Sequence, residues 1–425
     1  MKIHIYGDNL CALVSAALFA SVGHEIWLCL PEGRVKQTFA AHEEAYPEPR
    51  LQEMLDQQRK EQRLLISDLE QPLSEDTEAV FLAFAPKDFA LAEQMVKAIA
   101  QYDDYALVVI NQSTFAVGSS PYLAGLLPPV QSLVYVPDFT QEGMAIDSIA
   151  RPNKIILGCD DARAEATVRE IFRPFNRLKD HFLKMSLREA EFTKLAVSGM
   201  LATRISFMND LSNVADALGV DIEQVRVGVG SDKRIGEAYL YPGCGFGGQS
   251  FSEDVMSLAQ TVSGVGIKSK LLQQVLQINE DQKEVLFRKL WRYYDCNLHG
   301  KVVGIWGAAY KPNTNKIDNA PTLKILEALW AQGVTVKLHD PRALQKISQH
   351  YGQHPQLILC DSQYEAAEGV DALMLVTEWK QYWSPNFKRL KQAMKHPLIL
   401  DGRNIYDPAY LKQMGFEYVG IGRGL

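Results

Sequence analysis

Two stretches of the chain, residues 2–30 and 301–340, share one design that limits the folds open to it. Each has a short apolar run that ends at glycine, then an amphipathic helix pattern, then a turn at Gly23 or Gly333 into a second apolar run. A strand–helix–strand unit of this kind opens a parallel, doubly wound sheet. The chain therefore predicts an α/β fold with two such sheets.

Short apolar runs predict further strands on both sides of a helical centre. They lie at 79–84, 105–113, 133–137 and 154–158, and at 357–360, 372–376 and 397–400. From about Ser186 to Tyr294 the pattern is helical, with one long helix ending at Gly219 and another over 271–294. We expect two Rossmann-like doubly wound domains joined by a central helical domain, with boundaries at 1–185, 186–295 and 296–425.

The composition indicates a globular protein. The chain has 425 residues, of which 47% are hydrophobic and 22% charged, enough for two or three domains of ~100 to 200 residues each. A net charge of -7 argues against nucleic acid as a partner. The six cysteines have no CxxC spacing, so neither a zinc site nor a disulfide framework is indicated. No apolar stretch approaches ~20 residues and the first residues lead into a strand, so we expect a cytoplasmic protein with no membrane contact and no metal.

The string GFGGQSFSED, residues 245–254, has two interpretations. Three glycines in four residues let backbone amides approach a ligand, and a polar residue then opens a helical pattern. The segment is either an anion-binding loop or an ordinary turn into a helix. Ser250 and Glu253 have the S-x-x-E spacing of a capping box, which predicts that Ser250 caps the helix.

Seven strings together make the chain similar to the UDP-glucose/GDP-mannose 6-dehydrogenase family over nearly its whole length. They are QSTFAVGS (112–119), VPDFTQEGMAIDSIARPNKIILG (136–158), FTKLAVSGMLATRISFMND (192–210), RIGEAYLYPGCGFGGQSFSEDV (234–255), YKPNTNKIDNAP (310–321), VTEW (376–379) and DGRNIYDP (401–408). Their order and spacing are those of the family, which makes the resemblance specific.

The resemblance implies an NAD-dependent oxidation in two steps, in polysaccharide-precursor metabolism. The sugar 6-hydroxymethyl group becomes an aldehyde, a cysteine thiolate captures the aldehyde, and a second hydride transfer gives a thioester that water hydrolyses. The family fold has an N-terminal NAD domain, a helical dimerising centre and a C-terminal nucleotide-sugar domain. A symmetric homodimer and a nucleotide sugar are therefore the implied partners.

The resemblance places the reacting cysteine of the family's GFGGSCFPKD pattern on Ser250. The lysine of that pattern falls on Glu253 and its aspartate is kept as Asp254. A thiol at a helix N-terminus can ionise near neutral pH, whereas a serine hydroxyl needs a dedicated base. We expect the covalent step to be impaired at Ser250. Cys244, six residues upstream, is an alternative nucleophile.

Other catalytic positions are carried over from the family with partial agreement. Lys194 and Ser198 share one helix face, where the family has Lys and Asn to hold an oxyanion and a water. Asp138 takes the place of a family Glu, whereas Glu142 is kept, and these two carboxylates either share proton transfer or form a solvated turn. Thr114 matches the threonine that supports the catalytic water.

The cofactor motif departs from its usual form. A dinucleotide fingerprint requires Gly-x-Gly-x-x-Gly after the first strand and an acid at the end of the second strand. Here Gly7 is kept, Asn9 and Ala12 replace the later glycines, and Leu30 stands where the family has Asp. The resemblance also places Ser113 in this site. NAD is the implied cofactor, and the departures predict weak NAD binding or none.

The nucleotide-sugar side keeps more of the family pattern. The matching residues are Arg234, Phe246, Gly247, Gly248, Lys311 and Arg403. A diphosphate requires such cations, and arginine can bind it with two hydrogen bonds. One departure is Asp318, which replaces a family Arg. Two functions remain open: a nucleotide-sugar dehydrogenase that stops at the aldehyde, and a binding or regulatory homologue without redox activity.

Overall fold

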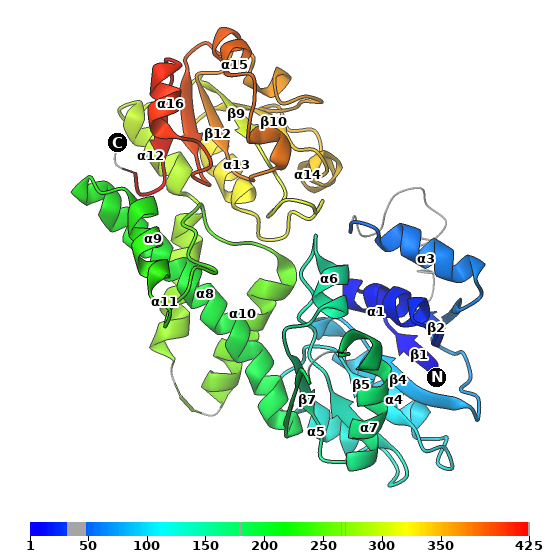
Figure 1. Cartoon of the computed structure of the whole chain (residues 1–425). Helices are drawn as coiled ribbons and strands as arrows, with labels where there is room; N and C mark the ends of the chain where they lie inside the picture. Colours follow the sequence, from blue (N-terminus) through cyan, green and yellow to red (C-terminus); the bar gives the residue numbers. More distant parts are fainter. Residues whose placement is uncertain (32–47, 178–179, 265, 268, 424–425) are drawn as a thin grey trace. The chain divides into compact units, whose positions relative to one another are not determined.

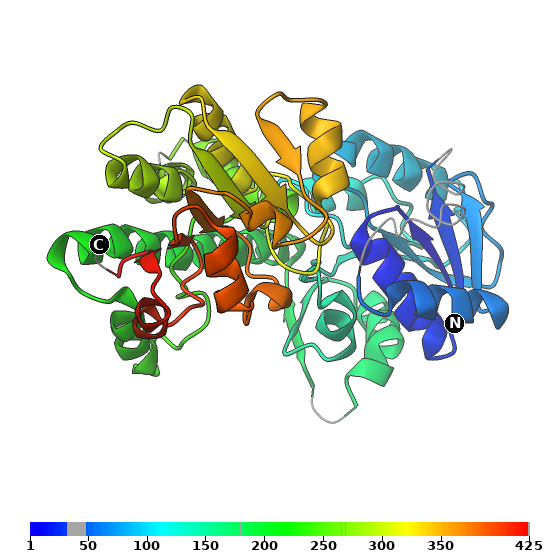
Figure 2. The ribbon, with the colours of Figure 1, turned by 90° about the horizontal axis from the view of Figure 1, so that it is seen from above.

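The computed structural model describes residues 1–31, 48–177, 180–264, 266–267 and 269–423 (Figure 1). Its contacts divide the chain into two compact units, Met1–Val197 and Ser198–Leu425. Each unit is built around its own twisted sheet, whose strands can be followed in Figure 1 and from above in Figure 2. Among the described residues no helix combines the length and the apolar character needed to cross a membrane.

The first unit contains an eight-stranded sheet in the order β3-β2-β1-β4-β5-β6-β7-β8. Neighbouring strands are parallel except β6 and β7, which pair antiparallel. The order 3-2-1-4-5-6 is that of a dinucleotide-type doubly wound sheet, as predicted. The strands are β1 (Lys2–Tyr6), β2 (Glu25–Leu30), β3 (Leu64–Asp68), β4 (Thr77–Leu82), β5 (Val108–Asn111), β6 (Ser132–Tyr135), β7 (Ile155–Gly158) and β8 (Phe182–Met185).

Both faces of this sheet are buried. In β4, Phe81 belongs to the core cluster that contains α1, whereas Leu82 belongs to the cluster on the other face. Apolar residues therefore follow one another along the central strands, as expected where helices cover both faces. The helices are α1 (Leu10–Ser21), α3 (Leu51–Lys60), α4 (Phe89–Ile99), α5 (Ser119–Ala124), α6 (Ala145–Ala150) and α7 (Ala162–Phe172).

The long helix α8 (Leu187–Leu218) passes from the first unit into the second, as the helical pattern ending at Gly219 predicted. It is followed by α9 (Ile222–Ser231) and α10 (Gln249–Gly264). The single helix expected over 271–294 is wrong, because the chain forms α11 (Lys270–Gln282) and then α12 (Val285–Tyr293). The break is stabilised by Arg288, whose guanidinium donates to the Asp281 carbonyl at 2.7 Å in place of an intrahelical amide.

The second unit contains a six-stranded parallel sheet in the order β11-β10-β9-β12-β13-β14, again the doubly wound order. Its core surrounds the stacked rings of Trp306 and Tyr382, both fully buried. The strands are β9 (Val302–Trp306), β10 (Thr335–His339), β11 (Leu357–Leu359), β12 (Ala372–Leu375), β13 (Leu398–Asp401) and β14 (Glu417–Gly420). The helices are α13 (Pro321–Ala331), α14 (Leu344–Tyr351), α15 (Phe387–Ala393) and α16 (Pro408–Gln413).

The strands predicted from apolar runs are confirmed, and three others, β3, β8 and β14, were not predicted. All three lie at the end of their sheet. An edge strand is covered less completely than a central one, so it carries polar residues such as Ser67, Lys184 and Glu417 that weaken the apolar signal.

Candidate functional site

The loop after β1 requires glycine at its first position. Gly7 has φ of +136°, and a Cβ atom there would lie 2.0 Å from the carbonyl oxygen of Ala83, which follows β4. The Gly7 amide donates to the Cys29 carbonyl at 3.1 Å. This close approach of β1, β2 and β4 gives the tight turn that the first glycine of a dinucleotide fingerprint provides.

The helix that follows this loop is capped by its own side chain. Asn9 is the N-cap residue of α1, and its Oδ1 accepts from the Ala12 amide at 2.9 Å. The N-terminus of a helix binds phosphate through amides of its first turn. One of these donors is therefore already bonded to Asn9, which adds a side chain where the fingerprint has none.

The other cofactor positions have structural contacts of their own. Leu30, the last residue of β2, is fully buried and offers no acceptor to a ribose. The Ser113 hydroxyl donates to the Leu82 carbonyl at 3.1 Å and accepts from the Phe84 amide at 2.9 Å, so it joins the ends of β4 and β5. The residues thus fit a dinucleotide at the turn and at the helix N-terminus, but the end of β2 does not fit its ribose.

In the second sheet, the loop after β9 corresponds to the loop after β1, and its amides donate to the carboxylate of Asp340. Asp340 follows β10, and its Oδ2 accepts from the amides of Ala308 at 2.7 Å and Ala309 at 3.0 Å. The indole Nε1 of Trp379 donates to the same oxygen at 3.0 Å. The amides after β9 are therefore satisfied internally, whereas the first sheet has Leu30 at the equivalent strand end.

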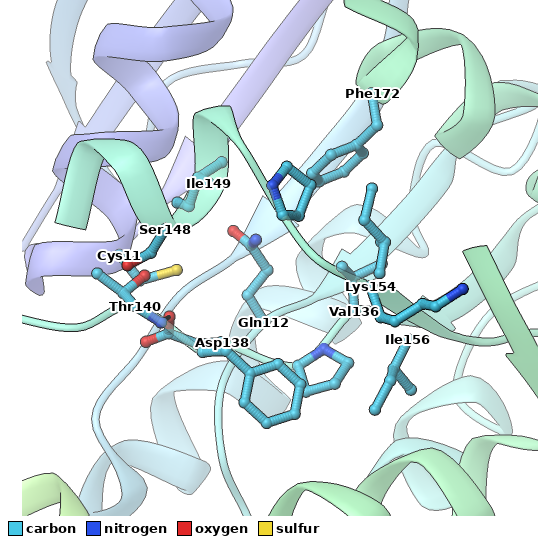
Figure 3. A pocket seen from close by; sticks show the side chains of 14 residues that line it. Cys11, Gln112, Val136, Asp138, Thr140, Ser148, Ile149, Lys154, Ile156 and Phe172 are labelled. Atoms are coloured by element: carbon cyan, nitrogen blue, oxygen red, sulfur yellow. Dashed lines mark hydrogen bonds between the residues drawn. The ribbon is translucent and has the colours of Figure 1, made fainter. Parts of the chain in front are cut away.

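Asp138 lies beside a small cavity of about 50 Å³ in the first unit. Its Oδ1 accepts from the Thr140 amide at 2.7 Å, which fixes the turn after β6. Figure 3 shows Asp138, Thr140 and Cys11 gathered on one side of this cavity. Burial raises the pKa of the Cys11 thiol, and the nearby Asp138 carboxylate raises that pKa further. The contact with Cys11 was not predicted, because a cysteine in a helix pattern gives no sign of its neighbour.

Lys194 approaches the same segment from α8. Its Nζ lies 5.0 Å from the ring centre of Phe139, at the distance of a cation–π contact. Glu142 and Thr114, the other predicted catalytic residues of this unit, are both half-buried. The structure thus brings Lys194 next to the loop that carries Asp138 and Glu142.

In the second unit, two predicted catalytic residues form a direct pair. The Ser198 hydroxyl on α8 donates to Asp254 Oδ2 on α10 at 2.8 Å, and both side chains are buried. The hydrogen bond connects residues of two helices that are 56 positions apart in the chain. Ser198 therefore holds the aspartate that follows the expected nucleophile position by four residues.

The glycine loop before α10 packs against another loop of the same unit. A Cβ atom on Gly247 would lie 2.7 Å from the Asn319 carbonyl oxygen, and one on Gly248 would lie 2.8 Å from the ring of Tyr310. Gly248 has φ of +91°, and its amide donates to the Asp318 carbonyl at 2.8 Å. Internal packing is thus sufficient to require these two glycines.

The predicted capping box is wrong. Helix α10 begins at Gln249, so Ser250 is an exposed residue of its first turn and not its cap. Glu253 accepts from Gln249 Nε2 at 2.8 Å, four residues away, instead of bonding the amide of Ser250. Gly248, with its positive φ, precedes Gln249 and lets the helix begin two residues earlier than a cap at Ser250 would imply.

Three buried amide side chains hold the segment before α10. Asn279 Oδ1 accepts from the Phe246 amide at 2.8 Å, and its Nδ2 donates to the Phe246 carbonyl at 3.1 Å. Gln282 donates to the Gly243 carbonyl at 2.8 Å, and Asn209 accepts from the Gly243 amide at 2.9 Å. These residues were missed, since a buried amide in an amphipathic helix looks like any polar position.

The predicted nucleotide-sugar cations differ in their surroundings. Arg403 is half-buried and donates from Nε to the Val376 carbonyl at 2.7 Å, with Glu378 Oε2 3.1 Å away. Lys311 Nζ lies 5.5 Å from the ring centre of Tyr310. Arg234 is 89% exposed and forms a two-contact ion pair with Asp232. Arg403 and Lys311 are thus held against the protein, whereas Arg234 points to solvent.

Cys244 does not offer a reactive thiol. Its side chain is fully buried in the core of the second sheet, with Sγ 3.6 Å from the Val376 carbonyl. Burial raises the pKa of this thiol. A buried neutral thiol is a poor nucleophile, so the alternative that assigned Cys244 this role is contradicted by the geometry.

The comparisons with known proteins cover the whole chain. Models of the UDP-glucose/GDP-mannose dehydrogenase family match residues 1–176 with its NAD binding domain, residues 188–281 with its central domain and residues 304–408 with its UDP binding domain. A UDP-glucose 6-dehydrogenase from Pseudomonas aeruginosa is 37% identical over 451 residues, spanning 100% of this chain and 98% of the relative. The chain belongs to the UDP-glucose/GDP-mannose dehydrogenase family.

Further relatives and solved structures are similar in sequence or in fold. The UDP-glucose 6-dehydrogenase TuaD of Bacillus subtilis is 29% identical, over 99% of this chain and 93% of the relative. A UDP-glucose dehydrogenase structure from Pyrobaculum islandicum superimposes with a TM-score of 0.85 at 26% identity, covering 99% of this chain and 97% of that one. A dehydrogenase structure from Pyrococcus horikoshii shares the fold, with a TM-score of 0.84 at 22% identity.

Proposed function

We propose that this member of the dehydrogenase family is an NAD-linked nucleotide-sugar oxidoreductase that oxidises the sugar 6-hydroxymethyl group to the aldehyde and completes the acid poorly. Full-length similarity to UDP-glucose 6-dehydrogenases supports the reaction class. The family's NAD and UDP binding domains match the two sheets, which supports the ligands. A cytoplasmic place in polysaccharide-precursor metabolism belongs to the same proposal.

The observation that carries this proposal is the residue in the first turn of α10. Ser250 is exposed there, at the position where the family pattern has its reacting cysteine. Capture of the aldehyde by Ser250 would need a base to remove the hydroxyl proton. Asp254, the acid one turn further along, already accepts from the Ser198 hydroxyl at 2.8 Å. We therefore expect the covalent step to be slow.

The first oxidation does not depend on that nucleophile. It transfers a hydride from C6 and a proton from the hydroxyl group, so it needs a base and a cation beside the oxygen. When bound, NAD supplies the hydride acceptor. Asp138 and Glu142 are the carboxylates proposed for the proton, and Lys194, which contacts Phe139 between them, is proposed to stabilise the developing oxyanion.

We propose that the three segments divide the work. Residues 1–185 would hold the cofactor at Gly7 and the N-terminus of α1, with the 296–425 segment binding the diphosphate through Lys311 and Arg403. The glycine loop at 246–248 would lie beside the sugar. Residues 186–295 would form the dimer.

An exposed apolar stripe on α8 supports a symmetric homodimer. Met200, Phe207, Val214 and Leu218 are 62%, 54%, 49% and 71% exposed, and the first three are spaced by seven residues. A seven-residue spacing places apolar side chains along one side of a helix, the arrangement used by paired helices. We propose a second copy of this chain as the partner, because two-fold symmetry would pair each stripe with itself.

A binding or regulatory function without redox activity is the second candidate. Two observations favour it: Asn9 bonds a first-turn amide of α1, and Leu30 removes the acceptor at the end of β2. Both changes weaken a dinucleotide site while leaving the second unit unaffected. This candidate predicts that nucleotide sugars bind and NAD does not.

Counting reduced cofactor per sugar distinguishes these functions. Purified protein would be mixed with UDP-glucose and NAD, with absorbance at the NADH band and hydroxylamine trapping of aldehyde as readouts. We expect one NADH for each trapped aldehyde from the unaltered protein, and a second NADH with formation of the acid from Ser250→Cys. Ser263→Cys, which adds a thiol at the exposed far end of α10, is the matched control and should resemble the unaltered protein.

Two NADH per acid from the unaltered protein would refute the proposal. Absence of NADH from both the unaltered protein and Ser250→Cys, together with thermal stabilisation by UDP-glucose but not by NAD, would establish the binding function instead.

A further inference from the structure

The end of β2 lacks the group that a dinucleotide needs there. In doubly wound folds an acid at this point accepts hydrogen bonds from the adenosine ribose hydroxyls. Leu30 occupies the position and is fully buried in the core cluster that contains α1. A ribose bound at this edge must therefore find its acceptor on another element.

The neighbouring strand carries a carboxylate at the same level. β3 pairs in parallel with β2, and Asp68, its last residue, lies opposite Leu30. Adjacent strands are only ~4.8 Å apart. Leu64 and Ile66 on β3 pack into the same core cluster as Leu30, so the two-residue alternation places Asp68 on that face of the sheet.

The Asp68 side chain is exposed and can accept from a ligand. Its Oδ1 accepts from the Glu70 amide at 3.1 Å, which fixes the carboxylate at the strand end and leaves Oδ2 without a hydrogen bond among the described residues. The carboxylate also lies close enough to the end of β2 to affect Cys29. Burial, with a smaller effect of Asp68, raises the pKa of that thiol to about 12.

We propose that Asp68 replaces the missing acid of β2 and accepts the adenosine ribose hydroxyls of the dinucleotide. This inference rests on the proposed NAD-linked function and deepens it, because it transfers cofactor recognition from the second strand to the third. A carboxylate at this point also repels a 2′-phosphate, so the site selects the unphosphorylated dinucleotide.

Equilibrium binding of two probes tests the role of Asp68. NADH and NADPH would be titrated into the full-length protein, with nicotinamide fluorescence as the readout. For Asp68→Ala we expect the Kd of NADH to rise roughly tenfold or more, because a hydrogen bond to a charged group is lost, while the Kd of NADPH stays the same or falls. Asp68→Glu should keep the preference for NADH. Glu75→Ala, a change of another exposed acid in the loop that follows, should leave both Kd values unchanged.

The outcomes separate this inference from the function on which it rests. If the unaltered protein binds NADH, and Asp68→Ala alters neither its Kd nor the ratio of the NADH and NADPH values, the role of Asp68 is overturned and the cofactor stands. If the unaltered protein binds neither probe, the NAD-linked function and the role of Asp68 are overturned together.

Discussion

Replacing Asn279 by alanine tests whether the buried amides fix the segment before α10. Asn279 is 2% exposed and makes two hydrogen bonds to the backbone of Phe246, one as donor and one as acceptor. The truncation would leave a buried N–H and a buried C=O without partners, at about 1–3 kcal/mol for each group. We expect the free energy of unfolding to fall by roughly 2–6 kcal/mol, a large part of the ~5–15 kcal/mol typical of a folded protein.

Urea unfolding followed by tryptophan fluorescence measures this loss. Trp27 is in the first unit, whereas the other tryptophans are in the second, so the signal mainly reports the unit that contains Asn279. The midpoint should fall with an unchanged m value. Gln277→Ala is the matched control, because Gln277 is exposed on the same helix and its side chain donates to Asp281 on the helix surface. Its effect should stay within about 0.5 kcal/mol. Equal effects of the two changes would refute the reasoning.

Two further predictions concern association and pH. Met200→Glu combined with Phe207→Glu should convert a homodimer to a monomer, because like charges would face each other across the paired α8 helices. Light scattering measures the mass. A monomeric unaltered protein, or an unchanged mass of the variant, would contradict the dimer. The Glu191 carboxyl accepts from the amides of Gly118 and Ser120, each at 2.6 Å, and burial raises its pKa. Its contribution to the free energy of unfolding is therefore present at acidic pH and is lost as the pH rises through the raised pKa. Glu191→Gln should flatten this part of the curve of unfolding free energy against pH, and an unchanged slope would show that another group titrates.

The central strands of both sheets could be predicted from the sequence because buried parallel strands are marked by continuous apolar runs. β1, β4 and β9 are of this kind, whereas edge strands such as β3 and β14 are partly solvated and lose the signal. The break between α11 and α12 was also not predictable. At the break the Arg288 guanidinium donates to a carbonyl seven residues earlier, a contact that leaves the apolar periodicity of the sequence intact.

The candidate site was predictable residue by residue only where a motif fixed the position. Ser198 and Asp254 are 56 residues apart and belong to different strings, and nothing in either string says that the hydroxyl donates to the carboxylate. The capping-box pattern at Ser250 misled for a related reason. Its spacing suits a helix that begins at that serine, but Gly248 can adopt a positive φ that allows an earlier start.

In the second sheet the Asp340 carboxylate occupies the place beside the loop amides where a bound phosphate could otherwise lie. A phosphate at the turn after β9 would have to displace the Asp340 carboxylate from these amides. Because Asp340 belongs to the same chain, it competes at a high and constant effective concentration, and the phosphate would only replace hydrogen bonds that the carboxylate already makes. The two sheets share their central strand order, yet the amides of Ala308 and Ala309 after β9 already donate to a carboxylate of their own chain. The strand order sets the geometry of this anion-binding loop, while the residue at the end of the neighbouring strand, Leu30 in one sheet and Asp340 in the other, decides whether its amides are available to a ligand.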